Sequence, residues 1–367
     1  GDGILGGVGA VLTFVPQILL MYLLLALLDA VGYMSRAAFL MDKVMSRAGL
    51  EGRAFVAMLS SFACAIPGIM ATRTIPSAKD RIATMLSAPL ATCSARLPVY
   101  VLLVGILVPA GSSLGPVSVR GLVLFGMYLL GALSAMLAAR VVKKITDRSG
   151  TLLPFYMEMP PYRIPTPRSV GMAMWEPTKA FLRKAGTIIM GATIVIWALT
   201  TFPLRSDAEM TAAGVDPSDE VAATAYNMEH SAAAKVGKAI EPVFAPQGFD
   251  WRIDISLIGS MAAREVAVST LGQVASASDP EDDVSVSESV QKWTYTDGPH
   301  QGEKVFTPDT TIAMLIFFAF SLQCVATIGI LKRESGGWKW PAIAFGYMFV
   351  LAWVGSSLAA VITRAVM

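Results

Sequence analysis

Long uninterrupted apolar runs are the feature that most constrains how this chain can fold. Each has roughly 20 residues, enough to cross a hydrocarbon core of about 30 Å as a helix. They include Val11–Leu28, Gly121–Ala139, Thr187–Phe202, Thr311–Ile330 and Ala342–Ile362. Inside a bilayer only helices and closed barrels satisfy their backbone polar groups, and these runs lack the alternation of barrel strands. The sequence therefore predicts an all-α, polytopic membrane helical bundle.

Composition agrees with this class and narrows the chemistry. Hydrophobic residues make up 54% of the chain and charged residues 15%, whereas a soluble domain carries about 25% charged residues. Three cysteines are too few for a disulfide framework, and all lie in apolar segments. The two histidines lie in polar loops, and the net charge of +2 says nothing by itself. We expect no nucleic-acid partner. No basic leader precedes the first run, so the chain looks like one that starts within a longer protein.

Eight membrane segments are predicted, and two of them differ from the rest. They are Ile4–Met34, Ala54–Ile75, Ile82–Val108, Val119–Val142, Phe181–Phe202, Ile253–Val274, Thr310–Leu331 and Pro341–Thr363. Segments 54–75 and 253–274 are rich in Gly, Ala, Ser and Thr, and each holds charge or proline. We expect these two to be broken or re-entrant, because irregular backbone is tolerated at membrane depth only beside a cavity.

Basic residues set the predicted orientation. If both unusual segments are re-entrant, 19 Lys and Arg fall on one side, in loops 35–53, 73–81, 140–184 and 332–339. The opposite side holds 7, in loops 110–120, 204–252 and 275–309. The richer side is predicted to be cytoplasmic. The two long outer loops carry 16 acidic residues, a solvated face that could also weakly attract cations.

This topology predicts two inverted repeats, each a helix, a re-entrant segment and two more helices. Residues 1–145 form the first repeat, with gate segments 54–75 and 82–108. Residues 146–180 form a cytoplasmic loop ending in an interfacial segment. Residues 181–367 form the second repeat, with outer loops 204–252 and 275–309. Inverted repeats place a substrate site near the midplane, at the broken segments.

Polar groups and sulfur gather in four short stretches of these segments. In the first, Pro67-Gly68 is expected to break the helix just after Cys64, with Met70 a weaker candidate. The second holds Pro89, Cys93, Ser94, Arg96 and Pro98, the third Gln323 and Cys324, and the fourth Arg264 and Glu265. Asp29 lies at the inner end of the first helix, where an interfacial role and a pathway role are equally open.

Each of these residues also has a structural interpretation. A membrane cysteine usually serves packing, and Arg264 and Glu265 could simply neutralise each other. An intramembrane ionisable residue is nevertheless a functional candidate by default. Because every cysteine lies among polar or helix-breaking residues, thiol and carboxylate ligands for a transition divalent cation are predicted at Cys64, Cys93, Cys324 and Glu265.

At these motifs the chain resembles the ferrous-iron transport protein B family, FeoB. The resemblance rests on Gly32-Tyr33-Met34-Ser35-Arg36, Cys64-Ala65-Ile66-Pro67, Cys93-Ser94-Ala95-Arg96-Leu97-Pro98, Ala262-Ala263-Arg264-Glu265-Val266 and Arg333-Glu334-Ser335-Gly336-Gly337-Trp338. Asp29 stands where many members have Glu. Nucleoside permeases share the gate segments in outline.

The resemblance implies a multi-pass permease that imports Fe²⁺ across the bacterial inner membrane, with Fe²⁺ as its transported substrate. It implies that the three cysteines lie on or near the ion path, with Glu265 beside it. The family's GTP-binding domain would gate transport, and this chain has no G-x-x-x-x-G-K-[ST] loop, so we expect no GTP site and no enzyme activity in it. Membrane lipid, small accessory Feo proteins and a second copy of the chain are the other implied partners.

Two other functions remain open. A permease for nucleosides or other organic solutes would bring aromatic and amide groups together at the midplane. A membrane scaffold for a GTPase would show no continuous polar path between Cys64 and Cys324. Whether the thiols share one cavity distinguishes these interpretations.

Overall fold

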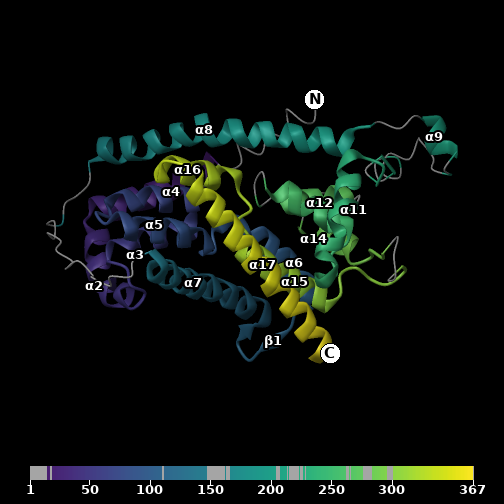
Figure 1. Cartoon of the computed structure of the whole chain (residues 1–367), viewed down its shortest axis with the longest axis horizontal. Helices are drawn as coiled ribbons and strands as arrows, with labels where there is room; N and C mark the ends of the chain where they lie inside the picture. The colour runs from purple at the N-terminus through teal and green to yellow at the C-terminus, as the bar shows by residue number, and fades with distance from the viewer. Residues whose placement is uncertain are drawn as a thin grey trace.

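Helices make up nearly all of the computed structural model (Figure 1). It describes residues 15–16, 19–109, 111–146, 162, 166–203, 207–212, 214, 223, 226–227, 229–261, 264, 266–275, 283–295 and 301–366. Strands in the described part are limited to β1 (Ser113–Leu114) and β2 (Val117–Ser118), an antiparallel hairpin. The predicted all-α class is confirmed, and within the described residues four helical segments, or five if the bent pair at the N-terminal end is one span, are long and apolar enough to cross a membrane.

Two unbroken helices match their predicted segments closely. Helices α7 (Val119–Thr146) and α17 (Lys339–Val366) have 28 residues each, about 42 Å at 1.5 Å per residue. Large apolar side chains such as Phe125 and Leu137 on α7 are exposed. A helix of this length that exposes apolar side chains is suited to face lipid.

The other two long segments are broken in the middle. Segment Ala78–Leu107 consists of α5 (Ala78–Ser87), the short turns η2 (Ala88–Leu90) and η3 (Ser94–Arg96), and α6 (Leu97–Leu107). Segment Pro308–Ser335 consists of α15 (Pro308–Phe320) and α16 (Val325–Ser335). The sequence analysis marks segments 54–75 and 253–274 as broken, and the structure adds these two interruptions, which lie within otherwise apolar runs.

The two predicted re-entrant segments do fold back on themselves. The first consists of α3 (Arg53–Ala63), α4 (Ala65–Ala71) and the turn η1 (Thr72–Thr74). A Cβ added to Gly68 would lie 2.8 Å from the carbonyl oxygen of Ala57. In α12 (Trp251–Ser260) and α13 (Val266–Val274), a Cβ on Gly259 would lie 2.8 Å from Thr270 Oγ1. Two residues that are eleven positions apart in an uninterrupted helix lie about 16 Å from each other. Both segments therefore reverse direction.

The break in the first re-entrant segment is not where the sequence predicts it. Cys64 alone has extended backbone, with φ −158° and ψ 139°. Pro67 and Gly68 lie inside the first turns of α4 and are buried. Proline is tolerated there because the first N–H groups of a helix have no partner within the helix. The glycine instead provides close contact between α3 and α4.

The N-terminal segment is bent rather than straight. Helix Leu19–Ala30 meets α2 (Tyr33–Arg47) at 82°. Gly32 at the bend has φ 84°, a left-handed conformation that glycine adopts without strain. The predicted span Ile4–Met34 therefore ends at this bend in the described part, and loop 35–53 contains a helix.

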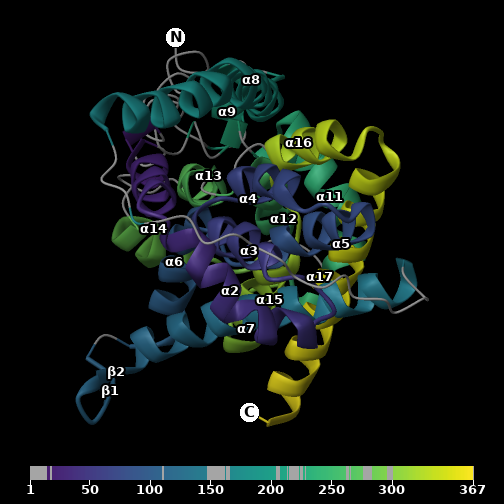
Figure 2. The ribbon, with the colours of Figure 1, turned by 90° about the vertical axis from the view of Figure 1, so that its left-hand side faces the viewer.

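Helix α8 (Pro167–Thr201) is continuous, so the predicted interfacial segment and the span Phe181–Phe202 form one helix of 35 residues. It lies across the top of the molecule in both views (Figures 1 and 2). The predicted outer loops also contain helices: α9 (Asp207–Ala212), α11 (Ala232–Phe244), the turn η4 (Ala245–Gln247) and α14 (Asp283–Val290).

The two halves end in the same order of elements: a folded-back pair, a broken segment and a straight helix. The β1–β2 hairpin, where α7 begins, and the C-terminus, where α17 ends, both lie at the bottom of Figures 1 and 2. Helices α7 and α17 therefore run in roughly opposite senses, as inverted repeats require.

Polar contacts join all four loops that were predicted to share the basic side. Glu334 binds Arg73 with Oε1···Nη2 at 2.5 Å and Arg81 with Oε2···Nη2 at 3.2 Å. Lys143 is paired with buried Asp80, and the Arg140 guanidinium donates to the carbonyl of Arg47. These contacts support the predicted topology.

Gly131 and Gly126 on α7 offer a matched test of the packing against the broken segment 78–107. A Cβ at Gly131 would lie 2.2 Å from Thr92 Oγ1 and 3.0 Å from its backbone nitrogen, whereas at Gly126 nothing lies within 4 Å. Alanine is favoured over glycine in a helix by about 1 kcal/mol at either site. We expect Gly131→Ala to cost roughly 1–3 kcal/mol by overpacking and to lower the melting temperature of the detergent-solubilised protein. Gly126→Ala should leave it unchanged or raised, and equal shifts would contradict this packing.

Candidate functional site

All three cysteines lie at helix breaks. Cys64 separates α3 from α4, Cys93 precedes η3 with ψ 159°, and Cys324 precedes α16 with φ −162°. Backbone carbonyls next to such breaks leave the regular i−4 hydrogen-bond pattern and need other partners. Each thiol is therefore accompanied by backbone oxygens that can bind a donor or a cation.

Hydrogen bonds connect the three cysteine-bearing breaks and the break of the second re-entrant segment. Ser94 Oγ donates to the carbonyl of Ala63 at 2.9 Å, which joins the Cys93 break to the Cys64 break. Arg96 Nη2 donates to the carbonyl of Ser321 at 3.4 Å, which joins it to the Cys324 break. The N–H of Val325 donates to the carbonyl of Met261 at 3.0 Å. The four stretches singled out in the sequence thus meet in one region.

Arg96 and Arg264 occupy the centre of this region. Arg264 is 4% exposed; its Nη1 lies 3.6 Å from Cys93 Sγ and its Nη2 lies 3.3 Å from the Ser321 carbonyl oxygen. Arg96 is fully buried and also donates to the carbonyls of Pro89, Leu90 and Ala91. Both guanidiniums therefore hold irregular backbone in place, which gives each a structural role.

The remaining predicted site residues lie around this centre or outside the described part. Met70 on α4 and Pro98 in the first turn of α6 are half-buried. Asp29 is exposed near the end of helix Leu19–Ala30, and its carbonyl accepts from Gly32. Glu265 lies outside the described residues. Within the described residues, no group of three or more His, Cys, Asp or Glu side chains could hold a metal ion.

Asp254 is a buried carboxyl group that the sequence analysis did not single out. It lies in α12 and is fully buried, and neither carboxylate oxygen has a hydrogen-bond partner in the described structure. Its electrostatic neighbours are Glu241 and Asp250, both acidic. The sequence alone could have identified Asp254, because it is an ionisable residue inside the predicted membrane segment 253–274.

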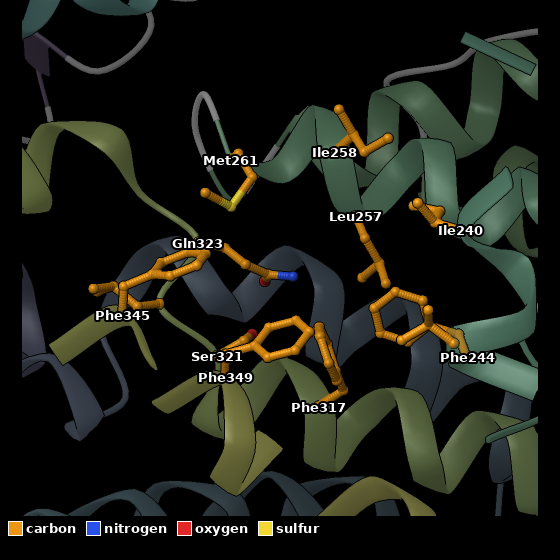
Figure 3. Close-up of a pocket in the computed structure, with 12 residues that line it drawn as sticks. Ile240, Phe244, Leu257, Ile258, Met261, Phe317, Ser321, Gln323, Phe345 and Phe349 are labelled. Atoms are coloured by element: carbon orange, nitrogen blue, oxygen red, sulfur yellow. The ribbon is translucent and has the colours of Figure 1, made fainter. Parts of the chain in front are cut away.

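A cavity of about 280 Å³ lies beside the Cys324 break (Figure 3). Its wall is almost entirely apolar, with Phe244, Phe317, Phe345 and Phe349 among the lining side chains. Gln323 and Ser321 provide polar groups, whereas no cysteine lines it. Aromatic and amide groups thus converge next to the Cys324 break, which is the feature expected of an organic-solute permease.

Comparisons with known proteins agree with the resemblance seen in the sequence. A family model described as "Gate: Nucleoside recognition" matches residues 11–107 and 182–338. Another, described as "Ferrous iron transport protein B C terminus", matches residues 124–176. No solved structure matches the chain.

Curated relatives match nearly the whole chain. A Porphyromonas gingivalis protein named "Fe(2+) transport protein A/Fe(2+) transporter FeoB fusion protein" is 42% identical over 97% of this chain and 43% of its own length. Proteins named "Fe(2+) transporter FeoB" from Leptospira interrogans and Helicobacter pylori are 41% and 35% identical over 96% and 98% of this chain, and 49% and 56% of their own lengths. The chain spans about half the length of these relatives, and it belongs to the FeoB family.

Proposed function

We propose that this chain forms the membrane pathway through which ferrous iron crosses the bacterial inner membrane. The observation that carries the proposal is the meeting of three cysteine-bearing helix breaks in one hydrogen-bonded region. The names of the relatives supply the ion, because each is called an Fe(2+) transporter. The chain thus acts as a transporter part rather than as an enzyme.

The chemistry of the breaks suits a partly dehydrated Fe²⁺ ion. A thiol is a softer ligand than water and favours transition metals over Na⁺ or Mg²⁺. Carbonyl oxygens outside the regular helix pattern can replace water ligands one at a time. Cys64, Cys93 and Cys324 would offer successive contacts, each weak enough to allow release, with Glu265 as a fourth predicted ligand.

Arg96 and Arg264 would keep the pathway closed in this conformation. Arg96 belongs to the first half and reaches Ser321 in the second, whereas Arg264 belongs to the second half and reaches Cys93 in the first. A cation can pass only if the positive groups move aside or are neutralised. Opening would therefore move one half relative to the other at these contacts.

A GTP-binding domain is the proposed source of that movement, as the family resemblance implies. The Porphyromonas gingivalis relative carries "Fe(2+) transport protein A" in its name, which supports a small Feo protein as another partner. Assembly with a second copy of the chain stays a prediction.

The rival functions are less well supported. The cavity beside Gln323 has the aromatic and amide groups of an organic-solute permease, but the relatives that cover nearly all of the chain are named for iron. A scaffold without a polar path is disfavoured by the contacts that run from Ala63 through Ser94 and Arg96 to Ser321. Uptake of labelled uridine beside labelled iron separates the two permeases directly.

Changing each cysteine to serine tests the thiol path. In the full-length protein we expect Cys64→Ser, Cys93→Ser and Cys324→Ser to reduce ⁵⁵Fe²⁺ uptake by cells, each by roughly tenfold or more, as loss of a metal contact does. Serine preserves size and hydrogen bonding but not soft ligation. Unchanged uptake in all three variants would refute the thiol path.

Arg264→Ala provides the contrast for folding. It removes the guanidinium that binds the Ser321 carbonyl, leaving a buried acceptor with fewer partners. We expect this variant to have both a lower melting temperature and a lower uptake of ⁵⁵Fe²⁺. The cysteine variants should keep the melting temperature and the membrane abundance of the wild type. A cysteine variant that melts as early as Arg264→Ala would indicate a packing role for that thiol.

Asp254→Asn tests whether the buried carboxyl takes part in cation passage. The amide keeps the shape but removes the charge, whose burial without donors is costly. We expect the full-length variant to melt no earlier than wild type and to take up ⁵⁵Fe²⁺ at roughly one-tenth of its rate or less. Glu288→Gln, at an exposed position on α14, is the matched control and should transport normally. Normal uptake by Asp254→Asn would remove this residue from the pathway.

A further inference from the structure

The cavity beside the Cys324 break has a composition that the iron pathway does not require. Three sets of apolar side chains surround it, from α11, from α12 with Met261, and from α15 and α17 (Figure 3). Among the residues that the structure describes, no charged side chain and no cysteine lines it. A wall of this kind gives a cation nothing to replace its water ligands, but it suits an apolar ligand.

We propose that this cavity binds an uncharged, lipid-soluble amphiphile taken from the bilayer, with a short apolar body and one hydrogen-bonding head group. The volume of about 280 Å³ is a little under twice that of an apolar cavity of about 150 Å³ that binds benzene, so it suits a ligand of roughly ten heavy atoms. A medium-chain alkanol has this size and this chemistry.

Two unpaired polar atoms define where the head group binds. Ser321 and Gln323 are each 3% exposed, and Ser321 Oγ and Gln323 Oε1 have no hydrogen-bond partner in the described structure. Figure 3 shows the Gln323 amide extending into the space between these apolar walls. Buried polar atoms without partners are destabilising, so a hydroxyl group at this end of the cavity would satisfy them.

The rim of the cavity indicates that the ligand comes from lipid. Val243 on α11 is 50% exposed and Phe345 on α17 is 37% exposed. Further along α17, Val350 and Leu351 are also exposed and apolar. An outer surface of this kind on a membrane-spanning helix contacts acyl chains, and burying an ionised ligand among the apolar side chains described here would be costly.

Photolabelling with 3-azioctanol tests the proposal. The full-length protein in phosphatidylcholine liposomes is irradiated with the probe, and peptides are analysed by mass spectrometry. We expect adducts in the peptides that contain Met261 and Phe345, with saturable protection by excess octanol. Adducts spread evenly over exposed apolar residues, or labelling that octanol does not reduce, would overturn the proposal.

Two cavity variants and one control variant make the test specific. Leu257→Trp fills the cavity and should reduce these adducts at least fivefold, whereas Val236→Trp, at an exposed position of α11 outside the cavity, should not.

Gln323→Leu tests the head-group site, because it removes one of the two unpaired polar groups. About five- to tenfold more octanol should be needed to protect this variant from labelling. Octane has no hydroxyl group, so the concentration of octane needed for protection should not change. The melting temperature of each variant shows that it is folded. Full labelling of Leu257→Trp would show that the adducts arise elsewhere. None of these readouts depends on iron transport, so this site and the proposed function can fail separately.

Discussion

The structure depends on satisfying backbone carbonyls where four helical segments are interrupted. A bilayer offers no water to these groups, so the protein must supply donors itself. Two buried guanidiniums do this: Arg96 donates to carbonyls of its own break, and both Arg96 and Arg264 donate to the carbonyl of Ser321. Arginine fits the task because its planar group carries five donors and can reach several oxygens at once. The irregular backbone at the centre therefore needs the two buried guanidiniums as donors, and its carbonyl oxygens in turn stabilise their positive charges.

The same helix interruptions determine the chemical groups around the cysteines and around the apolar cavity. Cysteines placed in regular helix would have only saturated backbone around them, whereas Cys64 and Cys324 adjoin breaks with extended backbone. The segment 321–324 has two faces: its backbone receives the arginines, and its side chains Ser321 and Gln323 line the apolar cavity. The proposed ion route and the proposed amphiphile cavity are thus adjacent without sharing their walls, which would separate soft-metal chemistry from amphiphile chemistry.

The sequence predicts the straight helices well and the interior less well. Apolar runs locate α7 and α17 within a few residues, because length and hydropathy alone determine a spanning helix. Composition rich in Gly, Ala, Ser and Thr correctly marks the folded-back segments, but apolar composition hides the interruptions near Cys93 and Cys324. Pro67 is misleading, since proline is harmless in a first helical turn. The meeting of the four stretches is set by tertiary hydrogen bonds between distant residues such as Arg96 and Ser321, which no local pattern encodes.

The contacts between the halves differ in how easily they can be changed. At the centre, Arg96 and Arg264 are buried, so water and salt do not compete for them. At the basic side, Glu334 at the end of α16 holds Arg73 and Arg81, and the Arg73 side chain is 47% exposed. Exposed ion pairs contribute little and are screened by salt. The exposed Arg73 is therefore the partner that is more easily drawn away, whereas the Glu334 side chain is only 4% exposed and must keep a partner such as Arg81. Because α16 begins directly after Cys324, movement of this helix would be transmitted to the central break, where the Ser321 carbonyl contacts both buried arginines.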